Sequence, residues 1–407
     1  MARIAVLSYH TSPLAQPGTG DGGGMNVYVR EMGAALARHG HDVVIYTRRD
    51  NPVVRDRVHV EPGLDVVNVT AGPAEAVALA GLSEYVDQFA DAVAVDFNCG
   101  GAPDAIHANY WLSGIAGHRL KHEFDIPLIT TFHTLEKIKA ATFDVESEGR
   151  SAEESRIIGC SDAVLASCDV EARQIVDLYD ANPARIHIVP LGVERAFFSP
   201  GTKAAARAAI GLNCADPVFL FAGRIQALKG VDLAVDAFIE YQRRNNSGHL
   251  AIVGGPSGPG GLDVVRELHH KIEGAGLVES VAFVAPQSHQ MLSTWFRAAD
   301  VTLVPSHSES FGLVALESMS CGTPIVASAV GGLTTLVDNG VNGRLMERRD
   351  PIEWADALED VLEPARALAL REASLSLASN YTWCRTAGAV ASIVTGLTNG
   401  SLLLCPA

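Results

Sequence analysis

Residues 301–328 read VTLVPSHSESFGLVALESMSCGTPIVAS and are the stretch that decides the fold class. The apolar run Val301–Val304 predicts a buried strand, and the periodicity that follows predicts a helix beginning near Phe311. Gly322 is typical of a helix end, and Pro324 opens a second apolar run. A strand, a helix and a second strand in this order predict parallel strands joined by a crossover helix.

The same alternation continues along both halves of the chain. Strands are predicted at residues 4–8, 41–47, 105–107, 127–131, 163–167 and 186–189, then at 217–222, 250–253, 281–284, 301–304 and 324–328. Apolar β-branched runs between helices are typical of parallel strands that are covered on both faces. Val189–Val193 interrupts the alternation, and we expect a linker there.

We therefore predict two doubly wound α/β domains in tandem. Residues 1–192 form the first domain, residues 193–380 the second, and residues 381–407 a C-terminal helix that packs back on the first. Ligands of such sheets bind outside the carboxyl ends of the strands, so we expect the two domains to face one another across a ligand cleft.

The composition excludes several classes of protein. The 407 residues are 48% hydrophobic and carry a net charge of −16, which argues against disorder and against binding to nucleic acid or an anionic membrane surface. The seven cysteines are scattered without a CxxC pair, which favours a reducing compartment over a disulfide framework or a zinc knuckle. No run reaches 18 apolar residues, and we expect a cytoplasmic protein.

A glycine-rich loop follows the first predicted strand. Gly18, Gly20 and Gly23 spell G-x-G-x-x-G, but about ten residues separate them from Ser8 and the second strand ends on basic residues. A dinucleotide fingerprint needs the glycines directly after the strand and an acid after the next one, so the context argues against a nicotinamide enzyme. Residues 22–24 instead predict exposed N–H groups that a diphosphate approaches at a helix N-terminus, with an ordinary surface loop as the alternative.

Two pairs of charged residues follow strands of the second domain. Glu309 and Glu317 are eight residues apart, about 12 Å along a helix, which suits one carboxylate on a sugar hydroxyl and the other on a ribose hydroxyl. The alternative is a helix-terminal charge with an ordinary exposed glutamate. Arg224 follows the carboxyl end of the strand 217–222, and we expect Lys229, five residues later, to lie at the same edge of the sheet. We expect both to bind a diphosphate, and the alternative is that they are two solvated loop charges.

These loops define the predicted donor-binding residues. They are Gly23, Gly24, Arg224, Lys229, Gln287, Glu309, Ser310, Phe311, Gly312, Leu313 and Glu317. We expect Gln287 at the edge of a base pocket. No Asp-x-Asp pair offers a metal–diphosphate clamp, so we predict no metal and no cofactor, with the cations and the helix N-terminus near Phe311 stabilising the departing diphosphate.

On this architecture, the motifs Gly22-Gly23-Gly24, Gly223-Arg224…Lys229-Gly230 and Glu309-x7-Glu317 resemble those of retaining nucleotide-sugar glycosyltransferases of the GT-B fold. The resemblance covers essentially the whole chain and implies two Rossmann-like domains that face each other across a cleft. The segment HTSPLAQPGTGDGGGMNVY (10–28) is similar to the D-inositol 3-phosphate glycosyltransferases of mycothiol biosynthesis, as are YWLSG (110–114) and HTL (133–135).

The resemblance implies roles for residues of both domains. In the second domain it implies that Arg224 and Lys229 bind the donor diphosphate, that Glu317 binds the ribose and that Glu309 binds the transferred sugar. In the first domain it implies that Gly24 faces the diphosphate.

It also implies that His133 contacts the 6-hydroxyl of the sugar and stabilises positive charge at the anomeric carbon through its carbonyl. The alternative is an ordinary loop histidine. The implied catalytic residues are His133, Glu309, Arg224 and Lys229, and the acceptor pocket would contain Asn26, Tyr110 and Thr134.

One departure from the family pattern concerns the acceptor. The family holds inositol phosphate with a lysine whose position falls at Leu79 here, and an arginine of the family maps near Arg150. Losing one cation from a phosphate pocket removes a charge-assisted contact of about 1.5–3 kcal/mol. We therefore expect a small unphosphorylated polar acceptor of a thiol or antibiotic pathway. The alternative is transfer from UDP-GlcNAc to 1D-myo-inositol 3-phosphate.

Other functions share this architecture. A sugar phosphorylase, a nucleotide-sugar epimerase and a non-catalytic sugar-nucleotide sensor remain open. The sequence does not distinguish a UDP donor from a GDP donor, and the resemblance implies UDP-GlcNAc. It also implies a small-molecule acceptor and a homodimer, while the net charge of −16 predicts no nucleic acid partner and no stable membrane binding.

Overall fold

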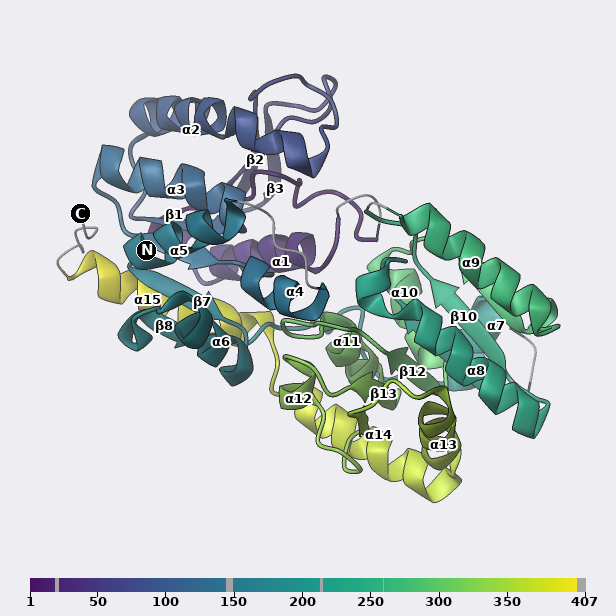
Figure 1. The fold of residues 1–407 in the computed structure, drawn as a ribbon. Coiled ribbons are helices and arrows are strands. Elements are labelled where there is room, and N and C mark those ends of the chain that lie inside the picture. Colours follow the sequence, from purple (N-terminus) through teal and green to yellow (C-terminus); the bar gives the residue numbers. More distant parts are fainter. Residues whose placement is uncertain (19–21, 144–148, 213–214, 259, 401–407) are drawn as a thin grey trace. The chain divides into compact units, whose positions relative to one another are not determined.

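The computed structural model describes residues 1–18, 22–143, 149–212, 215–258 and 260–400, which form two α/β units (Figure 1). The first unit holds Met1–Ala15, Gly24–Gly192 and the chain from Trp383 onward, and the second holds Gln16–Gly23 and Val193–Thr382. Gly20 of the predicted glycine loop and residues 401–407 of the predicted C-terminal segment lie outside the described residues.

The first unit is built on an eight-stranded sheet in the order β3-β4-β2-β1-β5-β6-β7-β8. Its strands are β1 Arg3–Leu7, β2 Asp42–Arg48, β3 Arg57–Glu61, β4 Leu64–Val69, β5 Ala105–Asn109, β6 Leu128–Thr131, β7 Ala163–Ala166 and β8 Ile186–Ile188. All neighbours are parallel except β3, which runs antiparallel to β4. The predicted strands of this half are confirmed, while β3 and β4 are additional.

Helices cover the first sheet. They are α1 Gly24–Arg38, α2 Val86–Gly100, α3 Trp111–Phe124, α4 Glu136–Phe143, α5 Arg150–Cys160, α6 Asp169–Tyr179 and α15 Trp383–Thr398, with 3₁₀ turns η1 Leu79–Tyr85 and η2 Pro183–Arg185. The C-terminal helix α15 packs against α1 (Figure 1). Thr386 Oγ1 of α15 donates to the carbonyl of Pro190 at 2.8 Å, which fastens the helix to the end of this unit.

The second unit is built on a six-stranded parallel sheet in the order β11-β10-β9-β12-β13-β14. Its strands are β9 Val218–Ala222, β10 His249–Val253, β11 Val281–Val284, β12 Val301–Val304, β13 Ile325–Ser328 and β14 Arg344–Met346. The five strands predicted here are confirmed. The strand order reverses between β9 and β12, and in open α/β sheets ligands bind outside the carboxyl ends of strands at such a point.

A helix follows each strand of the second unit, and α7 Lys203–Ala209 precedes its first strand. The other helices are α8 Val231–Asn245, α9 Gly261–Gly274, α10 His289–Ala298, α11 Leu313–Cys321, α12 Leu333–Leu336, α13 Pro351–Leu362 and α14 Pro364–Ala378, with 3₁₀ turns η3 Ala227–Lys229 and η4 Val278–Ser280. The predicted helix near Phe311 is α11, and Gly322 ends it in the left-handed conformation as expected. Among the described residues, no helix has the length and apolar character needed to cross a membrane.

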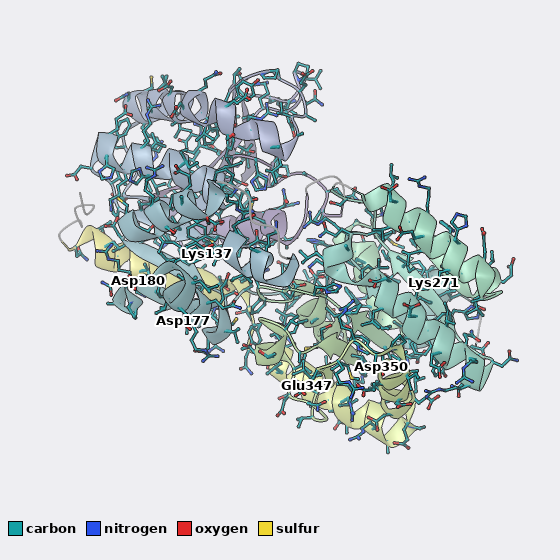
Figure 2. The ribbon with its side chains drawn as sticks, in the orientation of Figure 1. Lys137, Asp177, Asp180, Lys271, Glu347 and Asp350 are labelled. Carbon is teal, nitrogen blue, oxygen red and sulfur yellow. The ribbon has the colours of Figure 1, made fainter. Side chains whose placement is uncertain are left out.

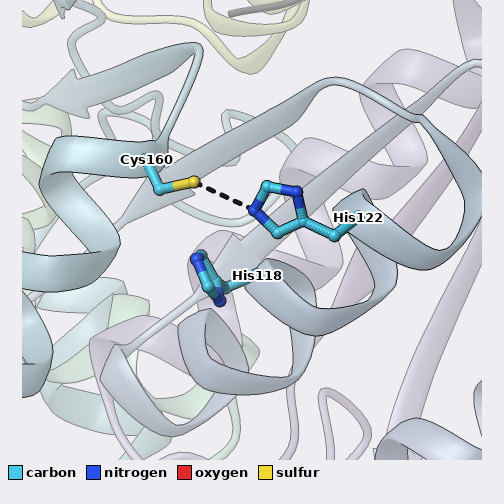
Figure 3. A group of neighbouring side chains, drawn as sticks. All are labelled: His118, His122 and Cys160. Atoms are coloured by element: carbon cyan, nitrogen blue, oxygen red, sulfur yellow. Dashed lines mark hydrogen bonds between the residues drawn. The ribbon is translucent and has the colours of Figure 1, made fainter. Parts of the chain in front are cut away.

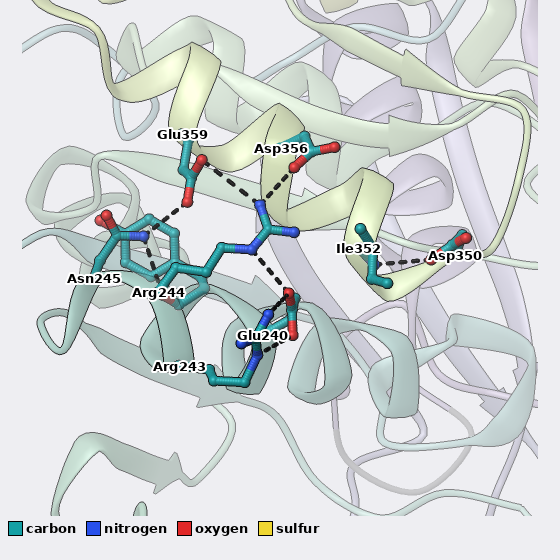
Figure 4. A network of polar contacts seen from close by, with 9 residues as sticks. Glu240, Arg243, Arg244, Asn245, Asp350, Ile352, Asp356 and Glu359 are labelled. Carbon is teal, nitrogen blue, oxygen red and sulfur yellow. Dashed lines mark hydrogen bonds and ion pairs between the residues drawn. The ribbon is translucent and has the colours of Figure 1, made fainter.

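Charged residues join the outer helices of the second unit. Arg244 of α8 lies between Glu240 of its own helix and Asp356 of α13, at 2.8 and 2.5 Å (Figure 4). Lys271 of α9, which is labelled in Figure 2, lies on the surface of the second unit. Its Nζ is 2.7 Å from Asp236 Oδ1 of α8. Exposed pairs of this kind contribute about 0–1 kcal/mol each to the free energy of unfolding. Most of the stability of this unit therefore comes from its buried core.

Candidate functional site

The reversal point of the second sheet is formed by the loops that follow β9 and β12. Gly223 begins the first loop, and its N–H donates to the carbonyl of Val253 at 2.9 Å. Gly254 approaches so closely that a Cβ there would overlap the carbonyl oxygen of Gly223. This packing fixes the backbone from which Arg224 leaves the sheet.

Arg224 lies beside the predicted glycine loop. The position that a Cβ of Gly23 would occupy is 3.5 Å from Nε of Arg224, and Nη1 of Arg224 lies 3.5 Å from Ser257 Oγ. Gln16 Nε2 also donates to the carbonyl of Pro286 at 3.2 Å, which holds the start of this loop on the same unit. The structure thus brings together two predicted donor residues that are about 200 positions apart in the sequence.

Lys229 and Glu309, the basic and acidic residues predicted to bind the donor, form an ion pair. Lys229 Nζ donates to Glu309 Oε2 at 2.6 Å, and Ser306 Oγ lies 3.2 Å from the same oxygen. The two side chains are 24% and 18% exposed, so both remain accessible to a ligand. Neither residue is the idle surface charge that the alternative interpretation describes.

The loops that carry this ion pair are joined by their backbones. The N–H of His307 donates to the carbonyl of Leu228 at 2.9 Å. Gly230 has a φ of 66°, and a Cβ there would overlap the carbonyl oxygen of Pro305. Arg349 Nη1 donates to that same carbonyl at 2.5 Å, so this arginine also braces the loop. The sequence gives no indication of Arg349 or Ser306, because neither belongs to a recognisable motif.

A second contact fixes the backbone of Glu309. The N–H of Gly332 donates to the carbonyl of Glu309 at 2.9 Å. Gly331 has a φ of 48°, and a Cβ there would overlap that carbonyl oxygen. The segment after β13 therefore holds the entrance to α11 in place.

Glu317 lies on α11 and is 6% exposed. Burial raises the pKa of its carboxyl to about 8, so the group is protonated at neutral pH. A carboxylic acid donates one hydrogen bond and accepts others, which suits a pair of vicinal hydroxyls. The interpretation of Glu317 as an ordinary exposed glutamate is wrong.

The other predicted donor residues differ in position. Ser310, Phe311, Gly312 and Leu313 form the entrance to α11, where Phe311 is buried and its ring centre lies 5.8 Å from that of Tyr381. Gln287 is partly exposed and donates to the carbonyl of Ala285 at 2.8 Å. Gly24 begins α1 and belongs to the first unit.

In the first unit, His133 follows β6 in a left-handed conformation with a φ of 61°. Its Nε2 lies 3.0 Å from Asn109 Oδ1, and its ring centre is 4.9 Å from that of Tyr28. Burial lowers the pKa of His133 to about 3, so the imidazole is neutral at physiological pH. A neutral imidazole binds by hydrogen bonds and supplies no charge.

The predicted acceptor residues Asn26, Tyr110 and Thr134 are each held by neighbours. Asn26 Nδ2 donates to Thr11 Oγ1 at 2.8 Å and to the carbonyl of Ser12 at 2.6 Å, which fixes the loop after β1. The backbone of Tyr110 has a positive φ of 76°. The carbonyl of Thr134 accepts a hydrogen bond from Arg150 Nη2 at 2.9 Å.

Arg150 is buried and ion-paired with two carboxylates. Its Nη1 lies 3.0 Å from Glu136 Oε2, and its Nε donates to Glu154 Oε1 at 2.8 Å. The guanidinium also lies 4.9 Å from the ring centre of Tyr110. Arg150 therefore braces Tyr110 and Thr134, and its charge is already balanced.

Leu79 opens η1 and is 37% exposed. Within the described ranges, no polar contact joins Leu79 or Gln287 to another predicted site residue. The sequence also missed Arg48 at the end of β2, a buried cation that donates to the carbonyls of Pro73 and Glu75 at 2.7 and 2.6 Å. Its guanidinium also lies 3.4 Å from the carbonyl oxygen of Ala71, so backbone carbonyls satisfy this buried cation.

A separate cluster of His118, His122 and Cys160 resembles a metal site. Their ligand atoms lie within 4.8 Å of one another, and His122 Nε2 is 3.3 Å from Cys160 Sγ (Figure 3). Cys160 is disulfide-bonded, which the scattered cysteines did not predict, so its sulfur is not a thiolate ligand. Arg156 also donates to Nδ1 of His118 at 2.9 Å. These residues do not fit a metal ion.

Family models and known proteins match nearly the whole chain. The model described as "Glycosyl transferase 4-like domain" matches residues 23–192, and "Glycosyl transferases group 1" matches residues 202–373. The D-inositol 3-phosphate glycosyltransferase of Xylanimonas cellulosilytica is 41% identical over 404 residues, which cover 96% of each chain. That of Acidothermus cellulolyticus is 42% identical over 394 residues, which cover 94% of this chain and 88% of the relative.

Solved structures share the fold. A sucrose-phosphate synthase from Thermosynechococcus elongatus matches with a TM-score of 0.90 and 30% identity, covering 98% of this chain and 100% of that one. HepE from Anabaena, in complex with UDP and glucose, matches with a TM-score of 0.78 and 18% identity over 98% of this chain and 100% of that one, a likeness in fold alone. The two Rossmann-like units are those of the GT-B class.

Proposed function

Because this chain belongs to the group 1 glycosyltransferases, in the family of D-inositol 3-phosphate glycosyltransferases, we propose that it moves a sugar from a nucleotide diphosphate donor to D-inositol 3-phosphate. The sugar is transferred with retention of configuration. The relatives support this phosphorylated acceptor, the alternative raised by the sequence, better than the unphosphorylated acceptor that was the main expectation.

The Lys229–Glu309 ion pair is the observation that carries the proposal. It lies on the loops after β9 and β12, where a doubly wound sheet binds its ligand, and Arg224 leaves the same β9 loop. An arriving diphosphate competes with Glu309 for Lys229, because both are anions. Donor binding then releases the Glu309 carboxylate to accept hydrogen bonds from hydroxyls of the transferred sugar.

The proposed transfer step needs no charged base from the protein. The bond between the anomeric carbon and the diphosphate oxygen breaks, and a bond to the acceptor oxygen forms on the same face. The proton of the acceptor hydroxyl goes to the departing diphosphate. Arg224 and Lys229 stabilise the charge that grows on that diphosphate, and preorganised cations of this kind lower a barrier by several kcal/mol in a site from which water is excluded. Protonated Glu317 binds the ribose hydroxyls.

The acceptor can be argued from two observations. The relatives favour the phosphorylated acceptor, and the buried cation Arg48 holds the loop that leads to η1 through the carbonyls of Pro73 and Glu75. Leu79 and the fully paired Arg150 favour a second candidate, transfer to an unphosphorylated cyclitol.

The proposal is tested by mass spectrometry of reactions with UDP-GlcNAc and either D-inositol 3-phosphate or myo-inositol. We expect a glycosylated product and stoichiometric UDP with the phosphorylated acceptor. Product with myo-inositol alone would favour the second candidate.

GDP-GlcNAc in parallel identifies the donor base, and inorganic phosphate alone tests for a phosphorylase. Glu309→Gln tests the role of the ion pair, because it keeps the side-chain shape and removes the charge. We expect this variant to fold but to transfer the sugar much more slowly. Turnover of the donor without any acceptor would contradict the proposal.

A further inference from the structure

Asn109 and His133 come from neighbouring strands of the first sheet. Asn109 is the last residue of β5 and is fully buried, and it lies opposite Thr131 at the end of β6. His133 follows two residues later, and its left-handed backbone turns the ring back to the end of β5. The resulting distance between His133 Nε2 and Asn109 Oδ1 is 3.0 Å.

The chemistry of the asparagine side chain fixes the direction of this hydrogen bond. The amide oxygen only accepts, so the Nε2 atom of His133 carries the proton and donates it. The amide nitrogen of Asn109 is engaged elsewhere, 3.4 Å from the carbonyl oxygen of His107. A neutral imidazole with its proton on Nε2 has its lone pair on Nδ1.

We propose that Asn109 is the positioning residue of His133, which holds the imidazole in the Nε2–H tautomer and so makes Nδ1 the acceptor for a hydroxyl of the transferred sugar. This inference rests on the proposed function, because it assigns His133 a partner in that reaction. Asn109 itself need not touch the substrate.

The described groups around His133 favour an uncharged imidazole. Tyr28 of α1 contacts one side of the ring, His107 of β5 lies nearby, and His10 follows β1. None of these groups is an acid that ionises near neutral pH, and the two histidines oppose a positive charge on a third. Asn109 adds a hydrogen-bond acceptor without adding a charge, which an aspartate at the same place would not do.

The Asn109→Asp variant is the decisive change. A carboxylate 3.0 Å from Nε2 stabilises the imidazolium, so we expect the pKa of His133 to rise. Below the raised pKa both ring nitrogens are donors, and Nδ1 no longer accepts the sugar hydroxyl. The transfer activity of the variant should therefore fall about tenfold for each pH unit below that pKa. The pH profile of the wild type should show no such loss at acidic pH.

Asn68→Asp is the matched control. Asn68 is also buried in the first unit, where its Nδ2 donates to the carbonyl of Arg55 at 2.8 Å, away from the predicted site residues. The substitution introduces the same charge, so it should leave the pH profile of transfer unchanged. Equal profiles for the two aspartate variants would overturn the inference.

The tautomer of His133 can also be measured directly, without a variant at position 109 and without an activity assay. Selective ¹⁵N labelling of the 14 histidines, with His133→Asn to assign the resonance by difference, reports the tautomer and charge of His133 in the wild type. We expect a neutral ring protonated on Nε2 between pH 6 and pH 8. A ring protonated on Nδ1, or a charged ring, would overturn the inference.

The two arms separate this inference from the proposed function. If the wild type transfers no sugar to any acceptor while the NMR spectrum reports the Nε2–H tautomer, the proposed function fails and the pairing of Asn109 with His133 stands. If the wild type is active but Asn109→Asp and Asn68→Asp behave alike, the proposed function stands and the positioning role fails.

Discussion

The two units treat their predicted functional residues differently. In the second unit the predicted residues contact one another. Lys229 pairs with Glu309, and Gly23 lies beside Arg224. In the first unit Arg150 also contacts two other predicted residues, Tyr110 and Thr134. His133 and Arg150, however, are held by residues that the sequence did not single out, namely Asn109 for His133 and two buried glutamates for Arg150. Residues that pair with each other can exchange their partner for a ligand, whereas residues clamped by the protein define the shape of a pocket.

The largest effect expected from this difference is on stability, in the first unit. Arg150→Met leaves Glu136 and Glu154 buried without their cation, and breaking a buried pair in this way costs about 3–5 kcal/mol. Urea unfolding measures the loss. Arg156→Met on the same helix removes only partly exposed contacts, with Glu153 and His118, and should cost about 1 kcal/mol. A small effect of Arg150→Met would show that Arg150 is free to serve a ligand.

Lys229→Met should do the opposite, with a large effect on activity and a small one on stability. Its partner Glu309 is partly exposed and can be solvated, but the departing diphosphate loses a cation. We expect kcat/KM for the donor to fall by about 10²–10³-fold. Lys271→Met, which removes an exposed lysine of the same unit, is the control for steady-state kinetics. An unchanged kcat/KM would remove Lys229 from the donor site.

Glu317→Gln sharpens the contrast between the two glutamates of the second unit. The folded state raises the pKa of Glu317 from 4.5 to about 8, so the unfolded chain ionises first as the pH rises. The wild type should therefore lose stability relative to Glu317→Gln between these two values, by at most about 1.4 kcal/mol per pH unit. Unfolding at pH 5 and pH 8 measures this, with the exposed Glu347→Gln as control. Parallel curves would contradict the burial of an uncharged Glu317.

The smallest expected effect tests the acceptor. Leu79→Lys places a cation at the position where the resemblance implies a lysine, and we expect kcat/KM for D-inositol 3-phosphate to rise about tenfold. The value for myo-inositol should stay the same. Leu178→Lys is the matched control, because Leu178 lies in the same unit and is 38% exposed against 37% for Leu79. Equal gains from the two lysines, or for both acceptors, would place the acceptor phosphate elsewhere.

Most strands could be predicted because parallel strands buried on both faces are continuous apolar runs. Strand β3 was missed because it carries Arg57, His59 and Glu61 and is only partly buried. Strand β4 is mostly apolar and almost fully buried, so its pattern could have been recognised. The three-residue strand β14 is too short to produce a pattern.

The candidate site could be predicted only in part. Arg224 and Glu309 stand directly after strands, where sequence position implies proximity. Asn109 also ends a strand, and its place beside His133 depends on the register of β5 against β6, which no local pattern contains. Arg349 braces the carbonyl of Pro305 through a contact between residues 44 positions apart. Such partners are fixed by tertiary packing.

The glycines at 230, 254 and 331 leave no room for any side chain, since a Cβ at each would overlap a carbonyl oxygen of a neighbouring loop. Random mutation is therefore tolerated very unevenly by this molecule. Almost every substitution at these three positions would be purged, while the exposed Leu79 accepts many residues without strain. A library aimed at new acceptors gains most from Leu79 and its neighbours, and the donor loops are best left untouched.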